Sequence, residues 1–507
     1  MDTPFPNQPP PYEGRNLYLT DVALRDAVVR EGAPWADGAL MQWGATLGAP
    51  ETYALADAAN RNGPQLRTLD RRGERIDSVE FHPAWDTLMR LATAAGLHCA
   101  PWAAPGPGAQ VARAAMYFLH AQVENGTQCP LTMTYASVPV LARHAATLPG
   151  GDRWLACVLA RDYDPRPLPI DAKRAALIGM GMTERQGGSD VRANLTRAEP
   201  AGDGAWRVTG HKWFFSAPQC DAHLVLAQAD AGITCFLLPH FLPDGARNAV
   251  RINRLKDKLG NRSNASAEVE FAGALAYPLG APGRGIPTIL EMVQHTRLDC
   301  VIGSAGMMRA ALAWALHHAV HRVAFGHVLV KQPLMAAVLA DLALEVEGAT
   351  ALALRLARAF DAPPNSAERA LARVATPAAK YWICKRAPMV ALEAMEVLGG
   401  NGYVEETPVP RVYREAPVNS IWEGSANVIC LDVLRAVERE PTAVEALAAE
   451  LALARGGNAD LDRATRSLLD ALTAPTRDAA GARRIAQGIA LSLAAATLVR
   501  NAAAPVA

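Results

Sequence analysis

Apolar residues recur at helical spacing over most of the chain, but not in its middle. Within about residues 21–177, AWDTLMRLATAAG and GAQVARAAMYFLHAQVEN place apolar side chains three and four positions apart, and long helical patterns return from about residue 288. Between about 178 and 281, the apolar runs are short, β-branched or aromatic, and Gly, Asp and Pro separate them. Such runs are typical of strands, so the order helical, β, helical points away from a Rossmann fold.

This pattern predicts an α+β multidomain protein. Its parts are an N-terminal arm and helical domain (1–177), a middle antiparallel β-barrel or sandwich (178–281), a C-terminal four-helix bundle (282–438) and an extra helical segment (439–507). Residues 1–20 are Pro-rich and predict an extended arm. A Gly-Gly-Asn break at 456–458 predicts one or two helices in the extra segment, and the ending NAAAPVA favours a truncated C-terminus.

Composition narrows the function classes. Lys+Arg and Asp+Glu both number 50, so no overall charge draws the protein to nucleic acid or to a membrane. The N-terminus lacks the apolar run of a signal peptide, and no apolar segment is long enough to cross a bilayer. The eight cysteines form no C-x-x-C pair, which favours reduced, buried thiols. We therefore expect a soluble, cytoplasmic protein.

Two segments around the β region carry candidate chemistry. GMGMTERQGGSDVRANLT (179–196) clusters glycines with the hydroxyls of Thr183 and Ser189. It could approach a flat ligand closely or be an ordinary Gly-rich turn, and it is not a G-x-G-x-x-G fingerprint. The three adjacent aromatics of GHKWFFSA suit a face against a ring ligand, but they suit a β core equally well.

Two further segments lie in the C-terminal helical part. In HRVAFGHVLVKQPL, Arg322 is a planar cation suited to a pyrophosphate, and Gln332 follows ten residues later; both could equally be surface residues. His317 and His321 are four residues apart but lack an accompanying acidic ligand, so no metal site is predicted. Glu423, beside Trp422 in IWEGSANV, is either a solvated acid or a desolvated carboxylate able to act as a base.

Together and in this order, these segments resemble the acyl-CoA dehydrogenase family over about residues 50–440. GMGMTERQGGSDV resembles its flavin loop, KWFFSA its second flavin-wall segment, and VLGGNGY and IWEGSANV its closing motifs. The Pro-rich arm, CPLTMTYASVPVL (129–141) and the segment after 439 look like the alkylation-response subgroup. That subgroup resembles isovaleryl-CoA dehydrogenases and is associated with DNA.

The resemblance implies an FAD-dependent enzyme. Residues implied to contact the flavin are Met182, Thr183, Gly188, Ser189, Phe214 and Ser216; those implied to contact a neighbouring subunit's FAD are Arg322, Gln332, Gly399 and Gly400; and those at the adenylate end are Ser425 and Asn427. Ser189 and Arg297 are implied to bind substrate. Shared cofactor contacts imply a homotetramer. The departures are Phe214 for a common Trp, and Glu396 and Asn427 for Gln.

The implied reaction is the dehydrogenation of an acyl-CoA thioester with a short or branched acyl group. Glu423 would remove the α-proton while the β-hydrogen leaves as hydride to flavin N5. The Glu423 backbone N–H and a ribityl hydroxyl would polarise the thioester carbonyl. An electron-transfer flavoprotein is the partner that the family resemblance implies.

A second hypothesis is a flavoprotein associated with double-stranded DNA that retains weak dehydrogenase activity. Its DNA contacts would come from the segment after residue 440, which carries seven arginines (455, 463, 466, 477, 483, 484 and 500) and six acids, a net charge of only +1. Non-specific DNA binding needs clustered cations, and only Arg483 and Arg484 are adjacent. The sequence therefore favours the enzyme.

Overall fold

The computed structural model describes residues 7–474 and 478–501, and the chain divides into two compact units. Unit 1 comprises Met1–Tyr53, Gly106–Val123 and Arg297–Ala507, and unit 2 comprises Ala54–Pro105 and Glu124–Thr296. Each unit therefore joins segments that are distant in sequence, whereas the sequence predicted four consecutive domains. The chain changes unit four times: within α3 (Pro50–Arg61), between residues 105 and 106, between residues 123 and 124, and within α9 (Gly285–His321).

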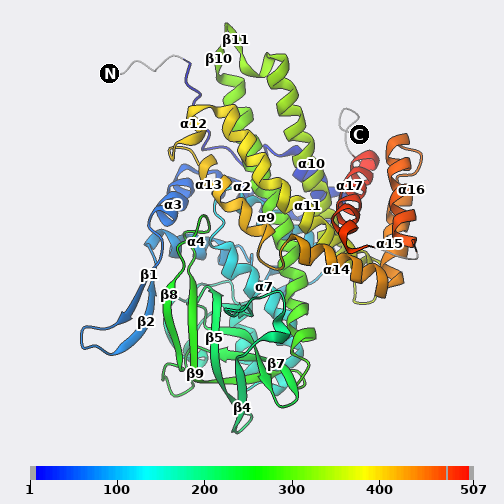
Figure 1. The fold of residues 1–507 in the computed structure, drawn as a ribbon. Helices are drawn as coiled ribbons and strands as arrows, with labels where there is room; N and C mark the ends of the chain where they lie inside the picture. The colour runs from blue at the N-terminus through cyan, green and yellow to red at the C-terminus, as the bar shows by residue number, and fades with distance from the viewer. Residues whose placement is uncertain (1–6, 475–477, 502–507) are drawn as a thin grey trace, which may run out of the picture. The chain divides into compact units, whose positions relative to one another are not determined.

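Unit 1 is helical, and α11 (Ala367–Leu398) is its central element, packed against α10, α14, α15 and α17 (Figure 1). Alanine and leucine dominate α10 and α11, and such small or unbranched side chains favour helices and let them approach closely. The other helices of unit 1 are α1 (Val22–Arg30), α2 (Asp37–Gly48), α6 (Ala109–Ala121), α10 (Pro333–Asp361), α12 (Gly400–Tyr403), α13 (Val409–Glu415) and α14 (Ala426–Arg439).

The segment after residue 439 forms three helices, where the sequence predicted one or two. They are α15 (Pro441–Ala452), α16 (Ala459–Thr473) and α17 (Ala482–Asn501). The Gly-Gly-Asn break separates α15 from α16, and the Asn458 side chain caps α16 by accepting hydrogen bonds from the Asp460 and Leu461 N–H groups. Arg477 and the C-terminal residues after Asn501 lie outside the described residues.

A β-barrel forms the middle of unit 2. Its strands are β3 (Ile178–Gly181), β4 (Arg197–Gly202), β5 (Ala205–Ser216), β6 (Ala222–Ala229), β7 (Gly232–Pro239), β8 (Val250–Leu255) and β9 (Ser266–Leu279). Pairing runs β6–β4–β5–β9–β7 and returns to β6, so the sheet closes. The sequence predicted an antiparallel barrel or sandwich; most pairings are antiparallel, but β6 pairs with β3 and β4 in parallel.

Unit 2 also contains a hairpin that the prediction of a helical region before residue 178 missed. Its strands, β1 (Gln65–Leu69) and β2 (Arg75–Glu80), are short and largely polar, so they leave no apolar periodicity to read. Arg75 donates to the Ile252 carbonyl at 2.8 Å, and Asp77 accepts from the Ile252 N–H at 3.2 Å, which ties the hairpin to β8. The α-helices that lie wholly within unit 2 are α4 (Pro83–Ala94), α5 (Ala100–Ala103), α7 (Gln128–His144) and α8 (Gly151–Leu159).

Two buried histidines lie in the barrel behind β5. The His223 ring stacks on Phe215, with 3.9 Å between centroids, and on His240 at 5.2 Å. A Cβ on Gly179 would lie 2.2 Å from His223 Nε2, so the ring occupies the space where a side chain at 179 would begin. Burial lowers the pKa of His240 to about 3, and burial together with the neighbouring His240 lowers the pKa of His223 well below its usual range.

These histidines should make the protein sensitive to acid. Below about pH 6.5 these two histidines bind protons in the unfolded chain but stay neutral in the folded protein. As the pH falls further, each histidine should therefore lower the free energy of unfolding by up to about 1.4 kcal/mol per pH unit. Denaturant unfolding between pH 5 and 8 measures this slope. We expect His240→Gln to flatten it, while His327→Gln, at an exposed position, should leave it unchanged. Equal slopes for His240→Gln and the parent protein would contradict this account.

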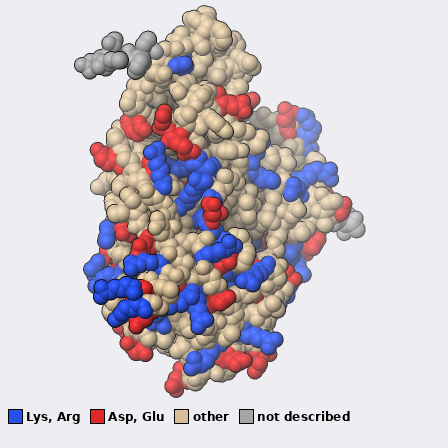
Figure 2. Space-filling model, turned by 60° about the vertical axis from the view of Figure 1, so that its left-hand side comes forward, with Lys and Arg blue, Asp and Glu red and all other residues tan. Residues whose placement is uncertain are grey.

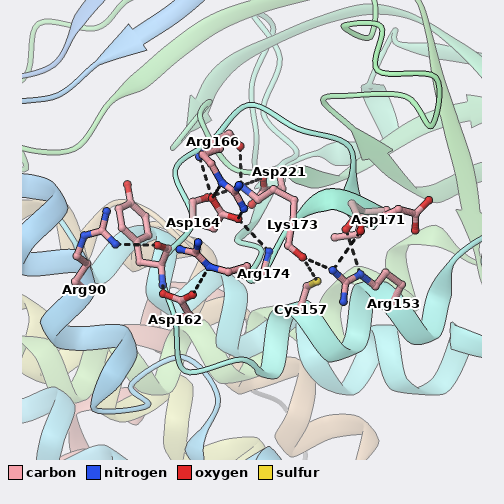
Figure 3. A network of polar contacts seen from close by, with 12 residues as sticks. Arg90, Arg153, Cys157, Asp162, Asp164, Arg166, Asp171, Lys173, Arg174 and Asp221 are labelled. Carbon is pink, nitrogen blue, oxygen red and sulfur yellow. Dashed lines mark hydrogen bonds and ion pairs between the residues drawn. The ribbon is translucent and has the colours of Figure 1, made fainter.

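A network of charges holds the segment between α8 and β3 (Figure 3). The buried Lys173 ammonium lies 2.8 Å from Asp221 and donates to the carbonyl oxygens of Asp164 and Arg166. Asp221 also accepts from the Leu177 N–H at 2.8 Å, one residue before β3. Burial raises the pKa of Asp221 to about 6, against the opposing effect of Lys173. The network therefore fixes the start of the strand that leads into the Gly-rich loop.

Replacing Lys173 by Met should destabilise the protein by about 3–5 kcal/mol at pH 8, because Asp221 would keep its charge without its partner. The loss should shrink at pH 5, where Asp221 carries a proton. Arg174→Met is the matched control: its side chain is 60% exposed and pairs with the exposed Asp162, so it should cost at most about 1 kcal/mol. Thermal and urea unfolding would measure the stability of both variants. An equal loss of stability in Lys173→Met and Arg174→Met would refute the role of burial.

Candidate active site

A fully buried ion pair anchors the Gly-rich loop of unit 2 to β5. Glu184 in the loop and Lys212 in the strand are both 0% exposed, with 2.8 Å between Oε1 and Nζ. Glu184 also accepts from the N–H groups of Leu195 and Thr196. Burial by itself would raise the pKa of Glu184, but Lys212 and these donors outweigh it and lower the pKa to about 2. The sequence analysis missed this pair, although both residues lie within the quoted motifs.

The anchored loop presents its predicted ligand-contacting residues next to β5. The Thr183 carbonyl accepts from the Trp213 N–H at 2.9 Å, and the Met182 carbonyl accepts from Asn194 Nδ2 at 3.0 Å. A Cβ on Gly188 would lie 2.3 Å from Thr183 Oγ1, so only a glycine allows this close approach. Ser189 follows at an exposed position. The structure thus brings Met182, Thr183, Gly188 and Ser189 together in one turn.

The aromatic run of β5 is divided between the barrel core and the open side. Phe215 is fully buried, whereas Phe214 is 54% exposed. Ser216 is partly exposed and, two residues from Phe214, points to the same side of the strand. Trp213 lies under the Lys256 ammonium, 3.6 Å from the ring centroid. Of the three aromatics, Phe214 is the most exposed, and the same Lys256 ammonium lies 4.8 Å from its ring centroid.

These unit 2 residues fit a flat aromatic ligand with a polar edge. Phe214 offers an exposed ring, and Thr183 and Ser216 offer hydroxyls. Hydroxyl and backbone groups can hydrogen-bond the pyrimidine edge of an isoalloxazine, and an aromatic side chain can cover its face. The residues present are therefore compatible with the flavin part of FAD.

In unit 1, the N-terminal arm contacts the segments predicted to bind a neighbouring FAD. The Asn7 side chain exchanges two hydrogen bonds with the Val323 backbone, and the Asn7 carbonyl accepts from Arg322 Nη1 at 2.7 Å. Gln332 donates to the Ala324 carbonyl at 3.0 Å. The neighbouring Gln8 accepts from Asn401 at 3.5 Å, directly after the exposed Gly399 and Gly400. Arg322, Gln332, Gly399 and Gly400 therefore gather at one end of unit 1, where β10 (Val323–Ala324) and β11 (His327–Val328) form a small turn.

Of the two spaced histidines of α9, His317 contacts this arm and His321 contacts the backbone of the same helix. His317 Nε2 lies 2.7 Å from the Pro10 carbonyl, and His317 Nδ1 lies 3.1 Å from Arg15. His321 Nδ1 lies 2.8 Å from the His317 carbonyl. Across residues 7–474 and 478–501, no group of three or more His, Cys, Asp or Glu side chains is placed to hold a metal ion. The histidine spacing is thus explained by contacts within unit 1.

Glu423 has a strained backbone conformation in a loop of unit 1 that hydrogen bonds hold in place. Its φ of 57° is left-handed, which costs a non-glycine residue about 1–2 kcal/mol. The Glu423 carbonyl accepts from Arg297 Nε at 3.1 Å, and the flanking carbonyls of Trp422 and Gly424 both accept from Lys380 Nζ. Strain of this kind persists only where the surroundings enforce it, and it concentrates at functional sites.

Arg297, predicted to bind substrate, is buried and pairs with Asp432 at 2.7 Å. Burial opposes ionisation of Asp432, but Arg297 and Arg373 together lower its pKa. Ser425, at the N-terminus of α14, is exposed and makes no capping hydrogen bond with its side chain. Asn427 accepts from Arg483 at 2.8 Å. Arg297 therefore supports the Glu423 loop, and Ser425 and Asn427 lie directly after that loop.

All eight cysteines are buried and free, in agreement with the expectation of reduced thiols. Within the described ranges, none of the helices has the length and apolar character needed to span a membrane.

Three family models match successive parts of the chain. The Adaptive response protein AidB N-terminal domain matches residues 7–165, the acyl-CoA dehydrogenase middle domain matches 179–274, and the acyl-CoA dehydrogenase C-terminal domain matches 283–438.

Individual relatives agree with these matches. AidB of Escherichia coli (strain K12) is 51% identical over 473 residues, which cover 93% of this chain and 87% of that protein. Acyl-CoA dehydrogenase family member 11 of Caenorhabditis elegans is 31% identical over 402 residues, 76% of this chain and 64% of that protein. The crystal structure of Caenorhabditis elegans ACDH-11 in complex with C11-CoA matches with a TM-score of 0.89 at 26% identity, covering 99% of this chain and 90% of that chain. The chain therefore belongs to the acyl-CoA dehydrogenase family, with an AidB-type N-terminal domain.

Proposed function

We propose that this protein is an FAD-dependent dehydrogenase of acyl-CoA thioesters in which Glu423 is the catalytic base. Membership of the family makes it an oxidoreductase that acts on CH–CH groups. The observation that carries the assignment of the base is the loop at Glu423, where two buried cations hold three successive carbonyls around a left-handed glutamate. Such rigid support is what a proton-abstracting group requires.

In this proposal the Glu423 carboxylate takes the α-proton of the acyl group, and the electron pair of that C–H bond forms the new C=C bond. FAD, when bound, supplies the acceptor for the β-hydrogen and its electron pair. A carboxylate can remove such a weakly acidic proton only when it is held close to the carbon and shielded from bulk water. Glu423 is partly buried in a fixed loop, and both features support its assignment as the base.

The residues proposed to hold the cofactor fall into two sets. Those for the flavin are Met182, Thr183, Gly188, Ser189, Phe214 and Ser216, of which Ser189 would also line the thioester; those for the phosphates and adenine are Arg322, Gln332, Gly399, Gly400, Ser425 and Asn427. Arg322 and Gln332 lie with the glycine pair at one end of unit 1. We propose that this end serves a neighbouring subunit's FAD, which implies a homotetramer.

The substrate is proposed to be a short or branched acyl-CoA, with an electron-transfer flavoprotein as the electron acceptor. The Caenorhabditis elegans structure with a similar fold is a complex with C11-CoA, so longer chains belong in the test panel. Chain-length preference depends on the shape of the acyl pocket, which makes a panel of substrates necessary.

The DNA-associated hypothesis draws less support from the structure. Three arginines of the segment after residue 440 already have partners: Arg463 pairs with Asp460, Arg483 donates to Asn427, and Arg500 pairs with Glu450. Figure 2 shows basic and acidic side chains interspersed over the face in view. A steep dependence of duplex binding on salt would support this hypothesis, and absence of binding at low ionic strength would reject it.

The decisive experiment is an anaerobic spectral titration of the FAD-loaded protein with isovaleryl-CoA, butyryl-CoA and undecanoyl-CoA. Bleaching of the flavin by one of these thioesters would establish the dehydrogenase and its substrate class. A yellow protein that none of them reduces would overturn the proposed activity and shift the balance to the DNA-associated hypothesis.

Glu423→Gln should greatly slow this reduction while leaving FAD bound, because the amide cannot accept the α-proton. The loss should be about 10²–10⁴-fold, the usual contribution of a positioned base. Glu406→Gln, an exposed acid in the preceding loop, makes the same chemical change and should keep the parent rate. Stopped-flow bleaching at 450 nm is the measurement, and an unimpaired Glu423→Gln protein would disprove the assignment of the base.

A further inference from the structure

Lys380 lies in the interior of α11 with an ammonium group that has no access to bulk water. The residue is 1% exposed. Its Nζ donates to the Trp422 carbonyl at 2.6 Å and to the Gly424 carbonyl, so its two hydrogen bonds bracket Glu423. A buried cation is costly unless oxygen atoms replace its water. Here the oxygens come from the backbone of a single loop, which fixes the loop to the helix.

A second helix holds the same loop from its other side. Arg297 in α9 donates to the Glu423 carbonyl and is itself fixed by Asp432. The Trp422 indole donates to Asn419 Oδ1 at 2.8 Å, and Asn419 donates to Ser304 of α9 at 3.0 Å. Arg297 of α9 and Lys380 of α11 thus hold the main chain of residues 422–424. Ser304 of α9 holds the Trp422 side chain through Asn419. The left-handed φ at Glu423 is the conformation that these contacts enforce.

Lys380 and Glu423 also lie within electrostatic reach of the same thiol. Burial raises the pKa of Cys300, Lys380 opposes that rise, and Glu423 adds to it. The positive charge of Lys380 therefore lies in the same neighbourhood as the Glu423 carboxylate, in addition to its contacts with the carbonyls.

We propose that Lys380 is a positioning residue that holds the Glu423 carboxylate in the geometry needed for α-proton removal. The inference rests on the proposed function of Glu423. Lys380 itself touches neither substrate nor cofactor in this account; it acts through the carbonyls on either side of the base. Reacting groups must be held within a fraction of an ångström, so release of this contact should slow proton transfer more than it weakens substrate binding.

The test compares FAD-loaded full-length protein with its Lys380→Met and Lys380→Arg variants. Acetyl-CoA has α-hydrogens but no β-carbon, so its hydrogen–deuterium exchange in D₂O, followed by NMR, reports the base without any redox step. Anaerobic flavin reduction by the best acyl-CoA reports the whole reaction. Lys385→Met is the matched control, because Lys385 is an exposed lysine five residues further along α11. Thermal unfolding and flavin absorbance show that each variant is folded and loaded.

We expect Lys380→Met to slow both exchange and flavin reduction by about 100-fold, the effect of displacing a reacting group by roughly 1 Å. The Kd for acyl-CoA should stay within about threefold, since uniform binding is untouched. Lys380→Arg, which keeps a cation, should fall between Lys380→Met and the parent protein, and Lys385→Met should match the parent.

The positioning role would be overturned if Lys380→Met exchanged acetyl-CoA hydrogens at the parent rate. It would also be overturned if the variant only bound acyl-CoA more weakly, with a raised Kd and unchanged rates. If Lys380→Met fails to fold or to hold FAD, Lys380→Arg decides the question. Slower exchange and flavin reduction in that variant, with correct loading and an unchanged Kd, would support the positioning role, whereas parent rates or a loss confined to its Kd would refute it. A parent protein that neither exchanges acetyl-CoA nor is reduced by any acyl-CoA would refute the proposed function itself, which is a distinguishable result.

Discussion

A buried ammonium or guanidinium group must find oxygen atoms to replace its hydration, and three parts of this protein depend on that requirement. Lys173 takes the carbonyls of Asp164 and Arg166 before β3, and Lys380 takes the carbonyls of Trp422 and Gly424 around Glu423. Lys212 pairs with Glu184 and also donates to the Leu226 carbonyl. In each case the cation is on or beside a regular element, and at least one of its partners lies in a loop. Irregular backbone is thereby given the rigidity of the helices and strands that surround it.

Buried cations therefore hold the Gly-rich loop of unit 2 and the Glu423 loop of unit 1 through different groups. In unit 2 the Gly-rich loop has its own carboxylate, and Glu184 stays ionised in the interior because Lys212 and backbone N–H groups compensate for its burial. In unit 1 the loop at Glu423 is held through the carbonyls of residues 422–424 and through the Trp422 indole.

The sequence was sufficient for the family, the helical–β–helical order and the candidate loops, because each depends on local motifs such as GMGMTERQGGSDV and IWEGSANV. Periodicity failed at the β1–β2 hairpin, whose strands are too polar to show alternation. It also could not reveal Lys380, which is 42 residues from Trp422 in sequence and reads as one more cation in an alanine-rich helix. Nor could it assign His317 to the N-terminal arm, since that contact joins residues 307 positions apart. Long-range polar contacts leave no periodic trace in a sequence.

The close packing of Gly179 against His223 has an evolutionary consequence. The His223 ring is stacked between Phe215 and His240 and occupies the position that a Cβ at residue 179 would take. Any side chain at 179 is therefore excluded while histidine occupies 223, although a strand would otherwise tolerate many residues there. A lineage can acquire such a side chain only after residue 223 has become smaller. The order of substitutions at these two positions is thus dictated by steric exclusion, and homologues that lack the glycine should also lack the histidine.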